Sequence, residues 1–112
     1  MNNSIDYPHG CSEFEIQAEL YHRLRNLGVD VRGSVPSKCE DFGKFKRVIF
    51  DLVVFKGSTA THIIECKSRE NTRTAPHQNS RQLRRYSKFG VPLIWCFHFD
   101  QIEETIKKVM TP

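Results

Sequence analysis

The sequence lacks the features that mark several large classes of protein. It has no apolar run of 18 or more residues, and its opening MNNSIDYPHG has neither a basic start nor an apolar centre. Neither a membrane span nor a signal peptide is therefore predicted. The four cysteines are scattered and form no C-x-x-C pair, which disfavours a zinc ribbon and favours free thiols over disulfides. We expect a soluble, cytoplasmic protein.

Length and charge limit the remaining possibilities. With 112 residues, of which 38% are hydrophobic, the chain can form a single domain with one modest core. The net charge is +4, and the segment from Lys67 to Lys88 holds seven bases but only one acid, Glu70. Such a basic surface suits a phosphate-rich partner, because each neutralised phosphate releases counterions. Charge alone does not distinguish it from a solvated helix face.

The first half of the chain predicts a helix followed by three strands. Ser12 and Glu15 have the spacing of a capping box, so a helix is expected over residues 13–27, ending at Gly28. A short strand is predicted over 29–35 and a surface loop over 36–46. Two apolar strands, 48–55 and 61–66, are separated by KGSTA, which indicates a hairpin.

The second half predicts a crossover helix, a strand and a last helix. Residues 68–74 are polar and predict a loop. Pro76 can begin a helix that ends near Phe89, and the strand VPLIWCF covers residues 91–97. Asp100 and Glu103 suggest a second capping box for a helix over about 100–110. The predicted fold is α/β, a mixed four-stranded sheet flanked by helices, in the order αβββαβ plus a C-terminal helix.

The hairpin carries one acid inside each apolar strand. With the turn centred on Gly57 and Ser58, opposed residues sum to about 116, so Asp51 faces Glu65 and Lys67 shares their side of the sheet. Two opposed like charges are destabilising unless a ligand compensates them. Oxygen ligands favour a hard ion such as Mg²⁺, for which Mn²⁺ can substitute. The alternative is a surface salt bridge between Glu65 and Lys67.

These residues resemble the PD-(D/E)XK nuclease superfamily. FDLVVF with Asp51 and IIECK with Glu65 and Lys67 match its pattern, and the element order is similar to its restriction-endonuclease-like core over residues 12–97. SEFEIQ followed by L-x3-L-x3-G resembles VRR-NUC domains, and the size is similar to archaeal Holliday junction resolvases. Phe50 stands where proline is frequent. On this resemblance, residues 1–112 form one nuclease-like domain, with a polar lead at 1–11.

The resemblance also implies roles for particular residues. Asp51, Glu65 and the backbone carbonyl of Cys66 would hold the metal, Lys67 would assist the attacking water, and an acid of the first helix would contribute to the site. Gln82, in a Q-x3-Y unit with Tyr86, resembles a motif of RecB-type nucleases. The implied nucleic-acid-binding residues are Arg69, Arg73, Arg81, Arg84, Arg85 and Lys88.

Three acids compete for the role of the first-helix acid. At 100° per residue, Glu13 lies about 20° from the centre of the apolar stripe, whereas Glu19 lies about 100° away and Glu15 about 140° away. We favour Glu13, because Glu15 is explained by the capping box and Glu19 can pair with Arg23.

Two functional hypotheses follow from these predictions. The first is a metal-dependent DNA nuclease that acts as a homodimer, since two-fold DNA targets suit a two-fold protein. The second is a nucleic-acid-binding or inhibitory protein that keeps a nuclease scaffold without turnover.

Overall fold

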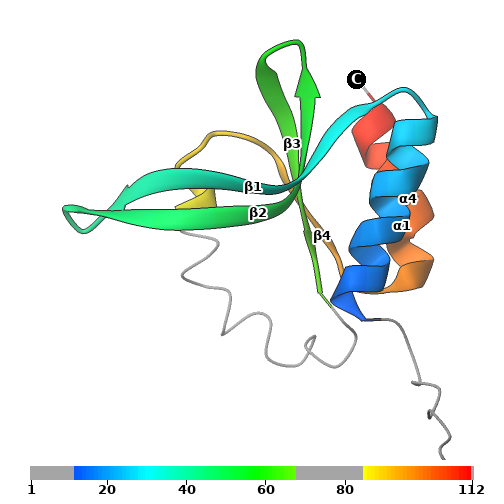
Figure 1. Cartoon of the computed structure of the whole chain (residues 1–112), viewed down its shortest axis with the longest axis horizontal. Helices are drawn as coiled ribbons and strands as arrows, with labels where there is room; N and C mark the ends of the chain where they lie inside the picture. Colours follow the sequence, from blue (N-terminus) through cyan, green and yellow to red (C-terminus); the bar gives the residue numbers. More distant parts are fainter. Residues whose placement is uncertain (1–11, 68–84, 112) are drawn as a thin grey trace, which may run out of the picture.

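The computed structural model describes residues 12–67 and 85–111. Its elements form a four-stranded mixed sheet with helices beside it (Figure 1). In chain order they are α1 (Glu13–Asn26), β1 (Asp30–Asp41), β2 (Lys44–Lys56), β3 (Thr59–Cys66), β4 (Leu93–Cys96), the 3₁₀ helix η2 (Phe99–Gln101) and α4 (Ile102–Met110).

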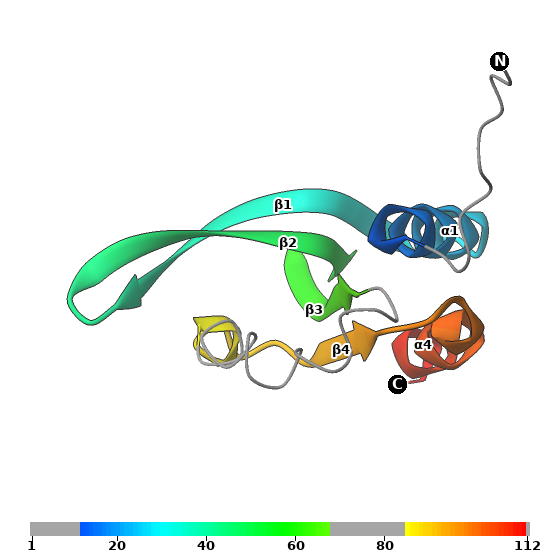
Figure 2. The ribbon, with the colours of Figure 1, turned by 90° about the horizontal axis from the view of Figure 1, so that it is seen from below.

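The sheet has the predicted connectivity. Its strand order is β1-β2-β3-β4, with the first two pairs antiparallel and β3 parallel to β4, as Figure 2 shows from below. Parallel neighbours need a crossover connection, and the chain between β3 and β4 supplies it. Within that connection residues 85–87 are helical. No described helix is long and apolar enough to cross a membrane.

Helix α1 forms as its sequence predicts. The Ser12 hydroxyl accepts a hydrogen bond from the Glu15 backbone N–H at 3.2 Å, and the Glu15 carboxylate reaches back to the Ser12 backbone, so the capping box is present. Gly28 follows the helix with a φ of +81°, a left-handed conformation that glycine adopts easily. The predicted start and end of this helix are both confirmed.

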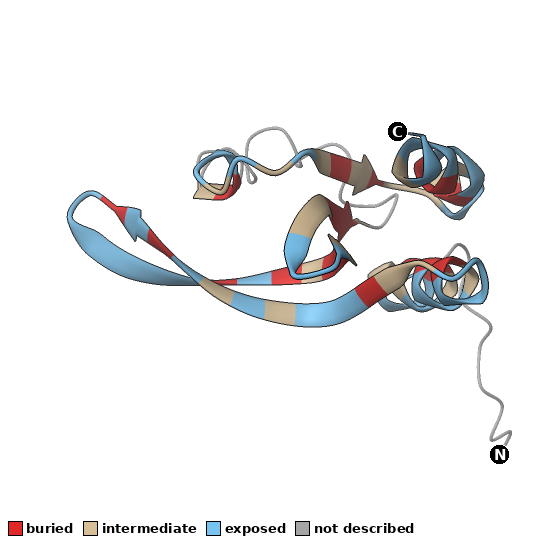
Figure 3. Cartoon of the chain, turned by 90° about the horizontal axis from the view of Figure 1, so that it is seen from above, coloured by how far each residue is buried: buried red, intermediate tan, exposed pale blue. Residues whose placement is uncertain are grey.

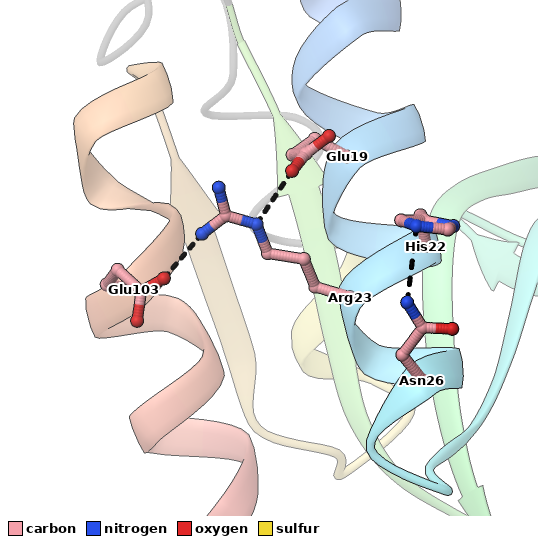
Figure 4. A network of polar contacts seen from close by, with 5 residues as sticks. All are labelled: Glu19, His22, Arg23, Asn26 and Glu103. Atoms are coloured by element: carbon pink, nitrogen blue, oxygen red, sulfur yellow. Dashed lines mark hydrogen bonds and ion pairs between the residues drawn. The ribbon is translucent and has the colours of Figure 1, made fainter.

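Helices α1 and α4 lie side by side (Figures 1 and 2). Arg23 joins them, because its guanidinium bonds Glu19 on α1 at 2.7 Å and Glu103 on α4 (Figure 4). Both helices pack on one face of the sheet. The core cluster between these helices and the sheet consists of Ile16, Leu20, Leu24, Val31, Leu52, Val54, Ile64, Cys66, Ile94, Cys96, Ile102 and Ile106.

A second apolar cluster lies on the opposite face of the sheet. Phe50 is its centre, with ring centroids 4.9 Å from Tyr86 and 5.1 Å from Phe89. Cys39, Val48, Val53 and Ile63 complete its buried part. The segment that leads into β4 therefore covers the face that the two helices leave open. Cys39, Cys66 and Cys96 are buried free thiols.

The loop predicted over residues 36–46 is wrong. Residues up to Asp41 continue β1, and β2 begins at Lys44, so the two strands form one long hairpin with Phe42 and Gly43 in its turn. Phe42 and Gly43 have φ values of +52° and +76°, as hairpin turns require. Pro36 is tolerated because β1 is an edge strand.

The capping box predicted at Asp100 is also wrong. A 3₁₀ turn precedes α4, and neither it nor α4 has a side-chain cap. Gln101 holds this junction instead, because its side-chain Oε1 accepts a hydrogen bond from the Phe97 N–H at 2.8 Å and its carbonyl accepts one from the Thr105 hydroxyl at 2.9 Å. The buried face of α4 includes Ile102 and Ile106, as expected.

Candidate active site

The two strand acids lie together, as the predicted register requires. The ladder pairs Leu52 with Ile64 and Val53 with Ile63, so Asp51 and Glu65 come next along the strands. A two-residue turn at Gly57 and Ser58 would by itself shift this register by one residue. A bulge between Val54 and Phe55 restores it.

The acids occupy the place where the β2–β3 ladder ends. The last backbone pair is Leu52 with Ile64. Beyond it, the Asp51 N–H donates to Glu65 Oε1 at 3.2 Å, and the Cys66 N–H donates to Asp51 Oδ2 at 2.8 Å. The carboxylates therefore accept the hydrogen bonds that strand separation would leave unmade. This reciprocal arrangement fixes both side chains.

The backbone of β2 changes direction at Asp51. Phe50 belongs to the second apolar cluster, whereas Leu52, two residues later, belongs to the first. Opposite this point Ser34 has a φ of +52°, and the β1–β2 register has no Ser34–Asp51 pair. The strand thus rotates at the acid, which lets Asp51 turn toward Glu65 although its neighbours are buried.

The burial of Glu65 strengthens its electrostatic interaction with Asp51. Glu65 is only 2% exposed. Burial, then a hydrogen bond with Asp51 and the charge of that carboxylate, raise the pKa of Glu65 to about 8, while the charge of Lys67 acts in the opposite direction. Near neutral pH Glu65 is therefore largely protonated when no cation is bound.

The pKa values of two neighbouring groups, Tyr86 and Cys66, are raised by burial and by nearby carboxylates. Burial raises the pKa of Tyr86, and the charge of Glu65 together with a hydrogen bond to it adds to that shift. Burial likewise raises the pKa of the Cys66 thiol, with further contributions from Asp51 and Glu13. Both groups stay neutral at physiological pH, so the site's charge resides in its carboxylates and in Lys67.

Helix α1 reaches the site through two residues. Gln17 Nε2 donates to the Asp51 carbonyl at 3.0 Å, a contact that sequence reasoning missed. Glu13 lies one turn earlier on the helix, and its charge acts on Cys66. Glu15 and Glu19 are engaged in the capping box and in the Arg23 ion pair. The structural roles assigned to those two acids are confirmed, and Glu13 keeps the candidate role.

The predicted nucleic-acid-binding residues fall into two groups. Arg85 Nε donates to Asp41 Oδ2 at 3.0 Å, and Lys88 Nζ lies 3.7 Å from Asp41 Oδ1 and donates to the Glu40 carbonyl. Both side chains therefore hold the far end of the β1–β2 hairpin. Gln82 and four of the predicted phosphate-binding arginines lie outside the described residues, namely Arg69, Arg73, Arg81 and Arg84.

The donors present have the chemistry of a small magnesium site. Mg²⁺ commonly binds one or two protein carboxylates and keeps several waters. Each acid uses one oxygen for a backbone N–H, and Glu65 also hydrogen-bonds Asp51 and Tyr86, so a cation would replace those contacts at the remaining carboxylate oxygens. Within the part of the chain that the structure describes, no group of three or more His, Cys, Asp or Glu side chains is arranged to hold a metal.

No family model, curated protein or solved structure matches this chain. Its resemblance to PD-(D/E)XK nucleases remains a prediction from sequence motifs.

Proposed function

We propose that this protein is a divalent-metal-dependent DNA nuclease with a restriction-endonuclease-like fold. The observation that carries the proposal is the contact between half-buried Asp51 and buried Glu65, fixed by backbone hydrogen bonds at the end of a strand ladder. A buried acid beside a second carboxylate is costly without a compensating cation. A basic residue, Lys67, stands two positions after Glu65 and acts on it electrostatically.

The metal would be held by Asp51, Glu65 and the Cys66 carbonyl, with Glu13 contributing through a water. When bound, Mg²⁺ or Mn²⁺ would lower the pKa of a water and offset the charge of the phosphate. The raised pKa of Glu65 fits this role, because a cation would displace the proton of Glu65 and be neutralised by the carboxylates.

The chain's own residues would direct the hydrolysis. Water adds its oxygen to phosphorus, the bond from phosphorus to one ester oxygen breaks, and the leaving oxygen takes a proton. Lys67 would orient the water and stabilise the negative charge that develops on phosphate. Gln17 would keep the Asp51 backbone in place through its hydrogen bond to the carbonyl. Gln82 is proposed as a substrate contact.

The test is cleavage of a panel of labelled DNA and RNA structures, including single strands, flaps, junctions and linear duplexes, with Mg²⁺, Mn²⁺ or EDTA. We expect metal-dependent cleavage of DNA. Asp51→Asn, Glu65→Gln and Lys67→Ala should each lower the rate about 10²- to 10⁴-fold.

Matched controls are available on exposed parts of the chain. Asp30→Asn, Glu104→Gln and Lys107→Ala make the same chemical changes at residues outside the site, and they should leave the rate unchanged. Cleavage that survives all three site substitutions in folded protein would reject the proposal. Salt-sensitive DNA binding with no cleavage under any metal condition would favour a noncatalytic binding or inhibitory protein instead.

A further inference from the structure

The outer half of the β1–β2 hairpin, residues 35–50, extends away from α1 and α4 (Figure 1). We call it the arm. Its inner face packs on the segment before β4, through Cys39, Val48 and Phe50. On its outer face both residues of three cross-strand pairs are exposed, and Figure 3 shows the pale blue of exposed residues along the arm. These pairs are Pro36 with Ile49, Lys38 with Arg47, and Glu40 with Phe45.

The arm's exposed charge is mainly positive. It carries four exposed bases, and none of them forms an ion pair with any residue of the described ranges. Glu40 is its one exposed acid, because Asp41 is 4% exposed and pairs with Arg85 and Lys88. A partner that is rich in negative charge would fit this surface. The four bases are Lys38 and Arg47 on the outer face, and Lys44 and Lys46 at register positions of the inner face.

Large apolar side chains stand among these bases. Phe45 is 79% exposed and Ile49 is 55% exposed. A hollow of about 370 Å³ beside Phe45 is lined by Lys38, Phe45, Lys46 and Arg47. A positively charged surface with aromatic rings is the usual design for single-stranded nucleic acid, in which cations contact the backbone and bases stack on the rings.

The same features disfavour a second copy of this chain as the occupant. β1 is the edge strand of the sheet, and Pro36 and Lys38 stand on it, as in edges that resist pairing with another strand. Two copies meeting through the arm would also bring like charges together. Complementary charge therefore favours a polyanion.

We propose that the outer face of the arm binds single-stranded nucleic acid, with a base stacked on Phe45 and phosphates held by Lys38 and Arg47. Phe45 precedes Asp51 by six residues of β2, a span of about 20 Å at most. If the proposed nuclease function holds, the substrate therefore carries a single-stranded segment beside the cut, as a flap or branch does. The binding itself does not depend on that function.

Binding is tested by fluorescence anisotropy in EDTA, so that cleavage cannot interfere. The probes are labelled oligo(dT), oligo(rU) and a blunt duplex of equal length. We expect the protein to prefer a single strand of either sugar to the duplex. Phe45→Ala should weaken single-strand binding about tenfold or more, as for a stacked base, with little change for the duplex. Phe45→Tyr should restore most of the loss.

Phe14→Ala is the matched control, because Phe14 is 77% exposed but lies on α1. It should leave the affinity unchanged. Equal binding of oligo(dT) by the Phe45→Ala and unmodified proteins would overturn the proposal, as would equal weakening for single strand and duplex. Sedimentation that shows a dimer lost in Phe45→Ala, with nucleic-acid binding unaffected, would assign the arm to a second copy.

The two proposals can fail separately. Normal binding through the arm without metal-dependent cleavage would remove the nuclease function and leave this inference intact. A different result would remove this inference and leave the nuclease function intact. It is cleavage that depends on Asp51, shows no preference for single-stranded segments, and is as fast in Phe45→Ala as in the unmodified protein.

Discussion

The two hairpins of this sheet share β2 and differ in almost every other respect. The β2–β3 hairpin has its apolar residues on both faces, covered by the helices and by the segment before β4. The arm is covered on its inner face only, and its outer face carries exposed bases and rings. β2 thus passes from an exposed basic segment at its start to a buried apolar segment, and the change occurs at Asp51.

The difference suggests that the two parts of β2 serve different functions, one in chemistry and the other in binding. Charge that is buried and fixed by hydrogen bonds suits chemistry, because its interactions are strong and need little reorganisation. Charge on exposed lysines suits binding, because it attracts a polyanion at long range and tolerates many geometries. Substitutions in the two hairpins should therefore affect different properties.

The largest contrast in stability is expected between two residues three positions apart. Leu52 is fully buried in the core, whereas Ile49 is 55% exposed on the arm. Leu52→Ala should lower the free energy of unfolding by about 2–5 kcal/mol, and Ile49→Ala by less than about 1 kcal/mol. Urea denaturation measures both. Similar losses for the two variants would mean that the arm's outer face is covered in solution.

The acid pair should make stability depend on pH. The folded-state pKa of Glu65, about 8, is above its ordinary value of 4.5, so between these values the folded protein holds more protons than the unfolded chain. The free energy of unfolding should therefore fall as the pH rises from about 4.5 to 8. Glu65→Gln cannot ionise, so it should match the unmodified protein near the lower value and exceed it above the higher one, by several degrees in Tm.

The effect of Mg²⁺ on thermal stability gives a second test of the raised pKa of Glu65. A cation that displaces the Glu65 proton should raise the Tm of the unmodified protein more above pH 8 than near pH 6, and should have little effect on Glu65→Gln. Glu104→Gln is the control, because Glu104 is 70% exposed in an ion pair with Lys108. The same pH profile in the Glu65→Gln and unmodified proteins would show that Glu65 titrates normally.

The sequence predicted the β2–β3 hairpin and the pairing of Asp51 with Glu65. A two-residue turn at Gly57 and Ser58 alone would shift that pairing by one residue, so the predicted register holds only because of a bulge. The bulge at Val54 and Phe55 left no signal of its own, although it sets that register. Gln17 could not be found either, because a polar residue on a helix says nothing of a carbonyl distant in sequence.

The arm was missed because its sequence has the composition of a loop. Pro36, Gly43 and many charges over residues 36–46 usually break strands. Here an edge position accepts the proline, and pairing of each residue with β2 outweighs weak strand propensity. The apolar residues that hold the arm in place come from a segment some 40 positions later, so no local pattern predicts its position.

A moderate effect is expected where the arm is attached to the rest of the fold. Asp41 is 4% exposed and pairs with Arg85 and Lys88, so Asp41→Asn should cost about 1–3 kcal/mol, since it removes the charge of a buried group that two partly exposed bases contact. Asp30, 42% exposed and paired with Arg32, is the matched control, and Asp30→Asn should cost less than about 1 kcal/mol. Equal costs would show that the arm is held by its apolar inner face alone.

The smallest expected effect concerns the exposed lysines of the arm. Each phosphate contact with a single strand contributes about 0.7 to the slope of log affinity against log salt concentration. Lys38→Ser should therefore reduce that slope by about this amount for oligo(dT), with no loss of stability, because Lys38 is exposed on the outer face. Lys107→Ser, on the outer side of α4, should leave the slope unchanged. A slope that is the same in both variants would place the phosphates elsewhere, and the basic segment from Lys67 to Lys88 would then be the surface to test.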